Sequence, residues 1–151
     1  MMDGLYEYGL WGLFLASFLA ATILPFSSEA VLAFMVATGF DLYACIWVAT
    51  IGNTLGGISC YYLGFIGNWG TIEKYLKIKP ENLIRTKSWL DKYGSFTAFL
   101  TWLPVVGDPL AVGLGIIRSN VVFVTIFMFT GKLLRYFAIA FFTDAFVTSS
   151  W

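Results

Sequence analysis

The sequence contains no histidine, only two cysteines and only four prolines. Without an imidazole, a Ser-His-Asp triad and a His-ligated zinc or haem are excluded. Cys45 and Cys60 lie in one long apolar run, too far apart for a disulfide if that run is helical, so we expect them to fill the core. Paired-cysteine motifs and Ser-Lys pairs at a defined spacing are also lacking. We therefore predict no metal, no cofactor and no enzymatic activity.

Charge is scarce as well: 12% of the 151 residues are charged, whereas 59% are hydrophobic. An ordinary soluble domain has roughly 25% charged and 45–50% apolar residues, so this composition indicates a membrane protein. Nine basic and nine acidic residues cancel, and the basic surface expected of a nucleic-acid-binding protein is missing. The length predicts a single membrane domain, residues 1–151, with few crossings at about 20 residues each.

Uncharged runs locate the candidate membrane segments. Only residues 8–28 and 42–72 reach the roughly 20 residues that cross a bilayer unaided. The shorter runs imply that single charges lie inside the membrane and that the chain in places turns back before crossing. No basic segment precedes the first run and no A-x-A site follows it, so we expect it to be retained and not cleaved as a signal peptide.

One hydrophilic stretch separates the apolar segments. Six of the nine basic residues lie between residues 74 and 92, with few acidic residues among them. Pro80 can start a helix there, and the apolar residues that follow gather on one face. We interpret residues 68–93 as an amphipathic segment on the cytoplasmic side, because basic residues favour that side of a membrane. A plain solvated connector is the alternative.

The two halves of the sequence follow one plan. A shift of 79 positions superimposes Thr22–Pro25 on Thr101–Pro104, Glu29 on Asp108, Asp41 on Asn120, and Gly52 on Gly131. Each half has an apolar arm, a proline, a carboxylate four residues later, a second apolar arm and a long apolar segment containing a glycine. We therefore predict repeats at about residues 5–66 and 94–143.

Prolines bend the apolar arm of each half: Pro25 in the first, Pro104 and Pro109 in the second. Because proline interrupts the hydrogen-bond ladder of a helix, each half is predicted to open with a re-entrant helical hairpin. Residues 42–66 and 121–143 then cross the membrane. The predicted fold is all-α, with two inverted repeats joined by the amphipathic segment, an architecture typical of secondary transporters.

Small residues mark the long helix of the first half. Gly52, Gly56 and Gly57 give it a face on which another helix can approach closely. We favour this packing role over direct contact with a substrate.

Four charges interrupt the apolar segments: Glu29, Asp108, Lys132 and Arg135. Such charges are expected to face a cavity or one another. Lys132 and Arg135 are three residues apart and share a helix face, and we predict that both carboxylates approach that face, with Asn53 beside it. The four charges and Asn53 form the predicted binding site for the phosphate of a lipid.

Simpler roles remain open for these residues. Glu29 follows Ser27 and Ser28, and Asp108 precedes Pro109, so both acids lie where a helix restarts and can complement its dipole or cap it. Lys132 and Arg135 can extend along the helix to reach the membrane surface.

Several motifs resemble those of one family: Leu24-Pro25-Phe26-Ser27-Ser28-Glu29-Ala30, Gly52-Asn53-Thr54-Leu55-Gly56-Gly57, Trp102-Leu103-Pro104-Val105-Val106-Gly107-Asp108-Pro109-Leu110 and Gly131-Lys132-Leu133-Leu134-Arg135-Tyr136. The chain resembles the DedA superfamily, also called the VTT or SNARE-associated Golgi protein domain, in its short YqaA-like branch. This resemblance implies two opposed re-entrant hairpins in a bacterial inner membrane. Larger members of the family are linked to the movement of phospholipids or undecaprenyl phosphate between leaflets.

One departure from the family pattern lies in the second hairpin. Many larger members have arginines before and after its proline, where this chain has Trp102 and Gly107. Lys132 and Arg135 are candidates to supply the missing charge.

The function predicted from these features is translocation of a phosphate-bearing lipid, with or without proton coupling. A structural or accessory membrane protein and a small-solute or ion transporter are the alternatives. Membrane lipids are the expected partners, nucleic acid is not, and association into a homo-oligomer is left open.

Overall fold

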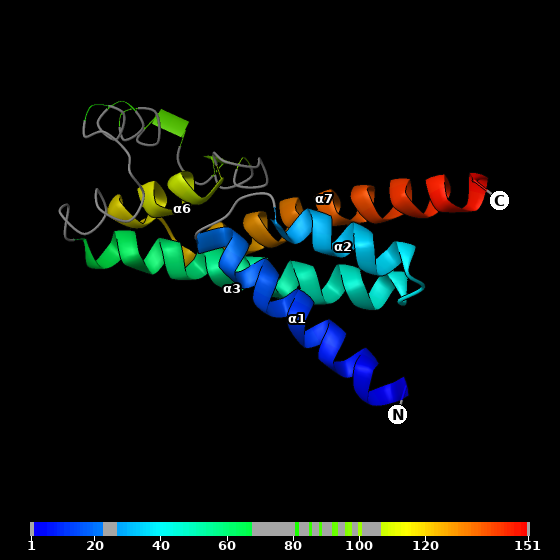
Figure 1. Ribbon diagram of the computed structural model, residues 1–151. Coiled ribbons are helices and arrows are strands. Elements are labelled where there is room, and N and C mark those ends of the chain that lie inside the picture. Colours follow the sequence, from blue (N-terminus) through cyan, green and yellow to red (C-terminus); the bar gives the residue numbers. More distant parts are fainter. Residues whose placement is uncertain are drawn as a thin grey trace. The chain divides into compact units, whose positions relative to one another are not determined.

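The computed structural model describes residues 2–22, 27–67 and 107–150 continuously, and residues 81, 85, 88, 92, 93, 96, 97 and 100 singly. The continuous ranges form helices and no strand: α1 (Met2–Thr22), α2 (Ser27–Ala37), α3 (Leu42–Ile66), α6 (Gly107–Ile116) and α7 (Val121–Ser149) (Figure 1). The all-α prediction is confirmed. Pro25, Pro104 and most of the predicted amphipathic segment lie outside the described residues.

Two of these helices are long and apolar enough to cross a membrane. They are α3, with 25 residues, and α7, with 29 residues. The helix α3 has the bounds predicted from the sequence, residues 42–66.

The helix α7 ends later than predicted, at Ser149 and not at residue 143. Asp144 lies within the helix: its side chain is exposed, and its carbonyl accepts a hydrogen bond of 2.8 Å from the Thr148 hydroxyl. Ser149 likewise donates to the Phe146 carbonyl. Hydroxyl side chains thus add hydrogen bonds to carbonyls in the last turns of α7.

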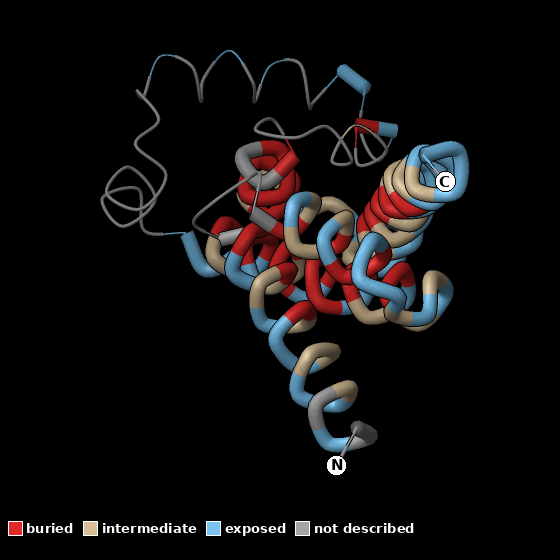
Figure 2. Tube along the Cα trace, turned by 45° about the vertical axis from the view of Figure 1, so that its right-hand side comes forward, coloured by how far each residue is buried: buried red, intermediate tan, exposed pale blue. Residues whose placement is uncertain are grey.

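One compact unit of the chain comprises Met1–Gly56 and Lys132–Trp151. Here α7 runs antiparallel to α3 (Figure 1). The core of the unit brings together α1, α2, α3 and α7 and contains Leu13, Leu32, Met35, Val36, Cys45, Ile46, Ala49, Tyr136 and Ala140. Figure 2 shows that burial decreases toward the C-terminal end of α7, where Phe142 and Phe146 are exposed.

Two glycines let α3 approach α1 closely within this unit. A Cβ atom on Gly52 would lie 2.7 Å from the carbonyl oxygen of Phe14. A Cβ atom on Gly56 would lie 2.6 Å from both the Cβ of Ala21 and the carbonyl oxygen of Phe18. Any larger side chain at these positions would force the helices apart, as expected where packing drives helix association. Gly57 is buried on the same helix.

The second compact unit comprises Gly57–Gly131. Its core is formed by residues of α3, α6 and α7: Cys60, Tyr61, Leu110, Ala111, Val112, Leu114, Val124 and Met128. The helices α3 and α6 meet at Gly64 and Gly115, whose Cα atoms face the backbones of Val112 and Tyr61. Both cysteines are buried, which confirms their predicted place in the core.

The two long helices begin with equivalent caps. The Asp41 carboxylate accepts a hydrogen bond of 2.8 Å from the backbone N–H of Ala44 at the start of α3. The Asn120 side chain accepts one of 2.9 Å from the N–H of Val122 at the start of α7. Such caps satisfy orphan donors at helix starts, and these two residues are 79 positions apart.

The close approach of α1 and α3 leads to a test of stability. We expect Gly56→Ala to lower the free energy of unfolding by about 1–3 kcal/mol, because the new methyl group overpacks the contact with Ala21 and Phe18. Gly12→Ala is the control: nothing lies within 4 Å of its Cβ position, so a better helix former should raise stability by about 0.5–1 kcal/mol. Denaturation of the purified protein in detergent, followed by circular dichroism, measures both. A Gly56→Ala protein as stable as the parent would contradict the close contact.

Candidate functional site

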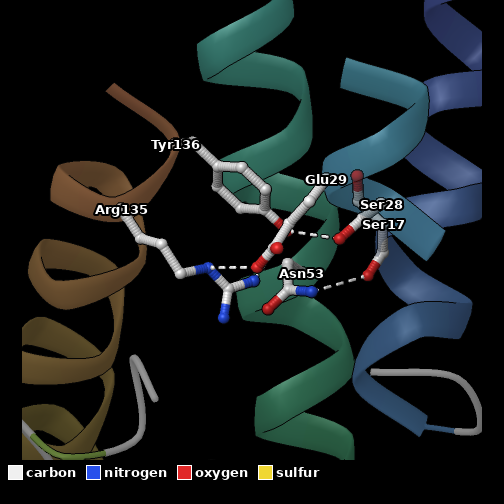
Figure 3. Close-up of polar contacts among 6 residues, drawn as sticks. All are labelled: Ser17, Ser28, Glu29, Asn53, Arg135 and Tyr136. Atoms are coloured by element: carbon white, nitrogen blue, oxygen red, sulfur yellow. Dashed lines mark hydrogen bonds and ion pairs between the residues drawn. The ribbon is translucent and has the colours of Figure 1, made fainter. Parts of the chain in front are cut away.

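Polar and charged side chains from four helices gather in the unit formed by Met1–Gly56 and Lys132–Trp151. Figure 3 shows six of them pointing toward one another: Ser17, Ser28, Glu29, Asn53, Arg135 and Tyr136. The rest of this unit is largely apolar. A polar cluster in such a setting has to satisfy its own hydrogen bonds and charges, since the hydrocarbon interior of a membrane supplies no partners.

An ion pair joins α2 to α7. The Nε atom of Arg135 lies 3.2 Å from Oε1 of Glu29, and 11% of the arginine side chain and 25% of the glutamate side chain are exposed. Glu29 is in the first turn of α2, where a negative charge complements the helix dipole. The predicted approach of a carboxylate to the basic face of α7 is thus present for Glu29.

Two hydroxyls form a second link between the same helices. The hydroxyls of Ser28 and Tyr136 lie 2.9 Å apart, and both residues are completely buried. The Nη2 atom of Arg135 donates to the Tyr136 hydroxyl over 3.4 Å, and its guanidinium carbon is 5.0 Å from the centre of the tyrosine ring. Consecutive residues on each helix therefore make consecutive contacts, Ser28 with Tyr136 and Glu29 with Arg135.

Lys132 and Asn53 form the inner part of the cluster. Lys132 is only 2% exposed, and its Nζ atom donates to the backbone carbonyl of Asn53 over 2.7 Å. The Asn53 amide donates in turn to the Ser17 carbonyl over 3.0 Å. Lys132 therefore points inward and does not extend to the surface. The hydroxyls of Ser17 and Thr54 are buried and have no hydrogen-bond partner among the residues that the structure describes.

Asp108 and Pro109 lie in the first turn of α6, as the sequence predicts for residues at a helix start. Their side chains are outside the described part of the structure. The predicted approach of Asp108 to Lys132 and Arg135 thus stays a prediction.

Sequence reasoning did not assign roles to Ser17 and Tyr136, and it considered Ser28 only as a helix cap. A serine or tyrosine in an apolar helix is compatible with many roles. The one available signal is adjacency: Tyr136 directly follows Arg135, and Ser28 directly precedes Glu29.

An apolar cavity of about 500 Å³ lies between α1 and α3, lined by Glu7, Leu10, Trp11, Phe14, Val48 and Ile51. None of these residues belongs to the polar cluster. Among the described residues, no group of three or more carboxylates and cysteines is arranged to hold a metal ion.

Arg135 gives the polar cluster a group that binds anions. The guanidinium of Arg135 offers several N–H donors in a fixed plane, a geometry that fits carboxylates and phosphates alike. In this structure its Nε atom is paired with one carboxylate oxygen of Glu29. A carboxylate can be neutralised by a proton, whereas a guanidinium stays charged.

Comparison with known proteins gives relatives along most of the chain, although no protein-family model and no solved structure matches it. The chain is 37% identical over 134 residues to inner membrane protein YqaA of Escherichia coli (strain K12), a match that covers 87% of this chain and 88% of the relative. It is 25% identical over 148 residues to undecaprenyl phosphate transporter A of Staphylococcus aureus, covering 88% of this chain and 71% of that protein. It is also 25% identical over 122 residues to an alkaline phosphatase-like protein of Lactococcus lactis subsp. cremoris, covering 72% of this chain and 57% of that protein.

A double-mutant cycle tests the energetic role of the ion pair. Glu29→Gln and Arg135→Gln should each destabilise the protein, because each leaves one charge without its partner. The double variant should be more stable than the sum of the two effects predicts, with a coupling energy of about 1–2 kcal/mol. Unfolding in detergent measures all four proteins.

The matched control replaces Arg118, an exposed arginine of the other compact unit whose guanidinium lies over the ring of Phe65. Combined with Glu29→Gln, Arg118→Gln should give additive effects. A coupling with Arg135 as small as that with Arg118 would show that the pair of Glu29 and Arg135 contributes nothing to stability.

Proposed function

The chain belongs to the DedA superfamily as a YqaA-like protein of the bacterial inner membrane, and we therefore propose that it carries a phosphate-bearing lipid between the two leaflets of that membrane. Undecaprenyl phosphate is the candidate cargo, since a relative is named as its transporter. The proposed activity is transport, with no chemical step on the lipid.

The observation that carries this proposal is the pair of Glu29 and Arg135 in otherwise apolar helices. A lone charge near the centre of a membrane helix costs about 2.5–3.5 kcal/mol on insertion scales. Pairing lowers that cost, but two apolar residues would avoid it altogether. Ionisable residues within membrane segments therefore point to a pathway for polar cargo.

Arg135 is the proposed phosphate ligand. Its side chain is partly exposed and lies beside the fixed cation of Lys132, one turn earlier on α7. Two positive charges on one helix face favour an anionic head group. The lipid tail stays in the hydrocarbon region while the phosphate passes along the polar cluster.

Glu29 is the proposed gate of this site. As a carboxylate it is paired with Arg135, and an approaching phosphate must compete with it for the guanidinium. When Glu29 takes up a proton, the ion pair is broken and the lipid phosphate can take the place of the carboxylate at the guanidinium. Translocation is then coupled to protons, and Asp108 at the equivalent position of the second half is the candidate for the corresponding role there.

We propose that the fold consists of two inverted repeats with re-entrant hairpins, as many transporters do. Three features support this arrangement. The caps Asp41 and Asn120 are 79 residues apart. Lys132 and Asn53, also 79 residues apart, contact each other. Each compact unit contains part of α3, part of α7 and one short helix, α2 or α6.

An accessory protein without transport activity is the second candidate. The contacts of Arg135 with Glu29 and of Lys132 with Asn53 tie α7 to α2 and α3. The same contacts would serve a protein whose charges only hold its helices together.

Reconstitution separates these functions. We expect the protein in liposomes to move fluorescent undecaprenyl phosphate between leaflets, measured by quenching of the outer leaflet. Arg135→Gln should slow this by about tenfold or more, the loss expected for a charge-assisted contact to phosphate. Glu29→Gln imitates the protonated carboxyl, so its rate should respond less to a pH gradient than the rate of the parent protein.

Asp144→Asn is the control for loss of an acidic residue, since Asp144 is exposed near the end of α7. It should keep both the rate and the response to pH. Correctly inserted protein that leaves the labelled lipid in place would favour the accessory role. Transport of small ions but not of lipid would favour an ion carrier.

A further inference from the structure

We propose that the Ser28 hydroxyl is a second ligand of the lipid phosphate, beside Arg135, and that Tyr136 positions this hydroxyl. The inference rests on the proposed function and deepens it. It assigns a binding role to a serine that sequence analysis considered only as a helix cap, and a positioning role to a buried tyrosine.

The direction of the hydrogen bonds between Arg135, Tyr136 and Ser28 depends on which groups can donate. A guanidinium can only donate, so the Tyr136 hydroxyl is the acceptor from Nη2 of Arg135 at 3.4 Å. The nearby positive charge also turns the hydroxyl dipole so that its proton points away from Arg135. In the proposed arrangement that proton is donated to Ser28, whose Oγ atom lies 2.9 Å away.

Ser28 then accepts from Tyr136 and keeps its own proton for another acceptor. The structure gives its hydroxyl no other partner among the described residues, although the residue is completely buried. The Ser17 hydroxyl, on the helix α1 that packs on α2, is likewise buried and without a partner. A buried donor left unused costs free energy, so it indicates a ligand that completes the bond.

The position of Ser28 points to an anionic ligand. It lies in the first turn of α2, an 11-residue helix whose N-terminal end carries partial positive charge. The chain from Arg135 through Tyr136 to Ser28 polarises the serine O–H further.

The ligand must have at least two oxygen atoms. When Glu29 leaves Arg135, an incoming oxyanion can accept from the guanidinium on α7 with one oxygen and from Ser28 on α2 with another. A phosphate fits this pair of donors, whereas an alcohol offers no charge to the guanidinium. Tyr136 contacts no ligand in this scheme and acts through Ser28.

The experiment uses proteoliposomes with fluorescent undecaprenyl phosphate at varied density, so that the apparent KM and the maximal rate are measured separately. Ser28→Ala should raise the apparent KM by about tenfold, the loss of one hydrogen bond to a charged group. Tyr136→Phe keeps the ring over Arg135 but removes the hydroxyl, and should raise the KM by a smaller factor. Because Tyr136 acts through Ser28, the double variant should match Ser28→Ala alone.

Tyr61→Phe is the matched control. Tyr61 is also a buried tyrosine, and its hydroxyl donates to the Ser119 carbonyl in the other compact unit. It should lose stability in detergent with no change in apparent KM. Should Tyr136→Phe fold poorly, the comparison of Ser28→Ala with the parent decides the proposal.

The outcomes are distinct. A parent-like KM in Ser28→Ala, with Arg135→Gln still impaired, overturns the role of Ser28 and leaves the proposed function standing. If Ser28→Ala and Tyr136→Phe change the apparent KM additively, and each change tracks the amount of folded protein lost, the positioning role of Tyr136 is overturned. The contact is then purely structural. Absence of lipid movement in the parent protein overturns the proposed function itself.

Discussion

The arrangement of the polar cluster depends on how the charge of Arg135 is balanced within an apolar helix. Glu29 supplies the counter-charge at 3.2 Å from the neighbouring helix α2. That contact requires the first turn of α2 to lie beside Arg135 of α7. The adjacent contact of Ser28 with Tyr136 fixes the same position along α7. In a membrane, where hydrophobic burial does not drive helices together, such polar contacts and close packing decide which helix faces meet.

Close packing of α1 on α3 makes the inner polar contacts possible. Gly52 and Gly56 allow the two backbones to approach until a single methyl group would not fit. At that separation the amide of Asn53, the residue after Gly52, reaches the carbonyl of Ser17 on α1. The carbonyl of Asn53 itself accepts from Lys132. The glycine packing and the burial of Lys132 are therefore linked. The helix α3, whose Asn53 carbonyl accepts from Lys132, is packed against α1 through its glycines.

The sequence predicts those parts of the structure that depend on local pattern. The uncharged run after Asp41 gives α3, and the interruptions at Glu29, Lys132 and Arg135 mark the polar cluster. Contacts between distant segments leave no such pattern, and Ser28 and Tyr136 are 108 residues apart. In the sequence alone, Ser28 resembles an ordinary helix cap and Tyr136 an ordinary core residue. The last residue of α7 could not be predicted from the sequence either. An exposed aspartate such as Asp144 is compatible both with the interior of a helix and with its end.

If the two halves are the repeats proposed above, the contact of Asn53 with Lys132 gives a physical reason for their difference at this point. If the halves are repeats, these residues occupy equivalent positions, and equivalent positions touch only beside the axis that relates the repeats. Two lysines there would bring two like charges together in a medium of low dielectric constant, where repulsion is strong. A neutral residue opposite Lys132 avoids this repulsion, and its carbonyl supplies an acceptor for the ammonium group. In the proposed repeats the cation is therefore retained in the second half alone, at Lys132, and the first half has the neutral Asn53 in its place.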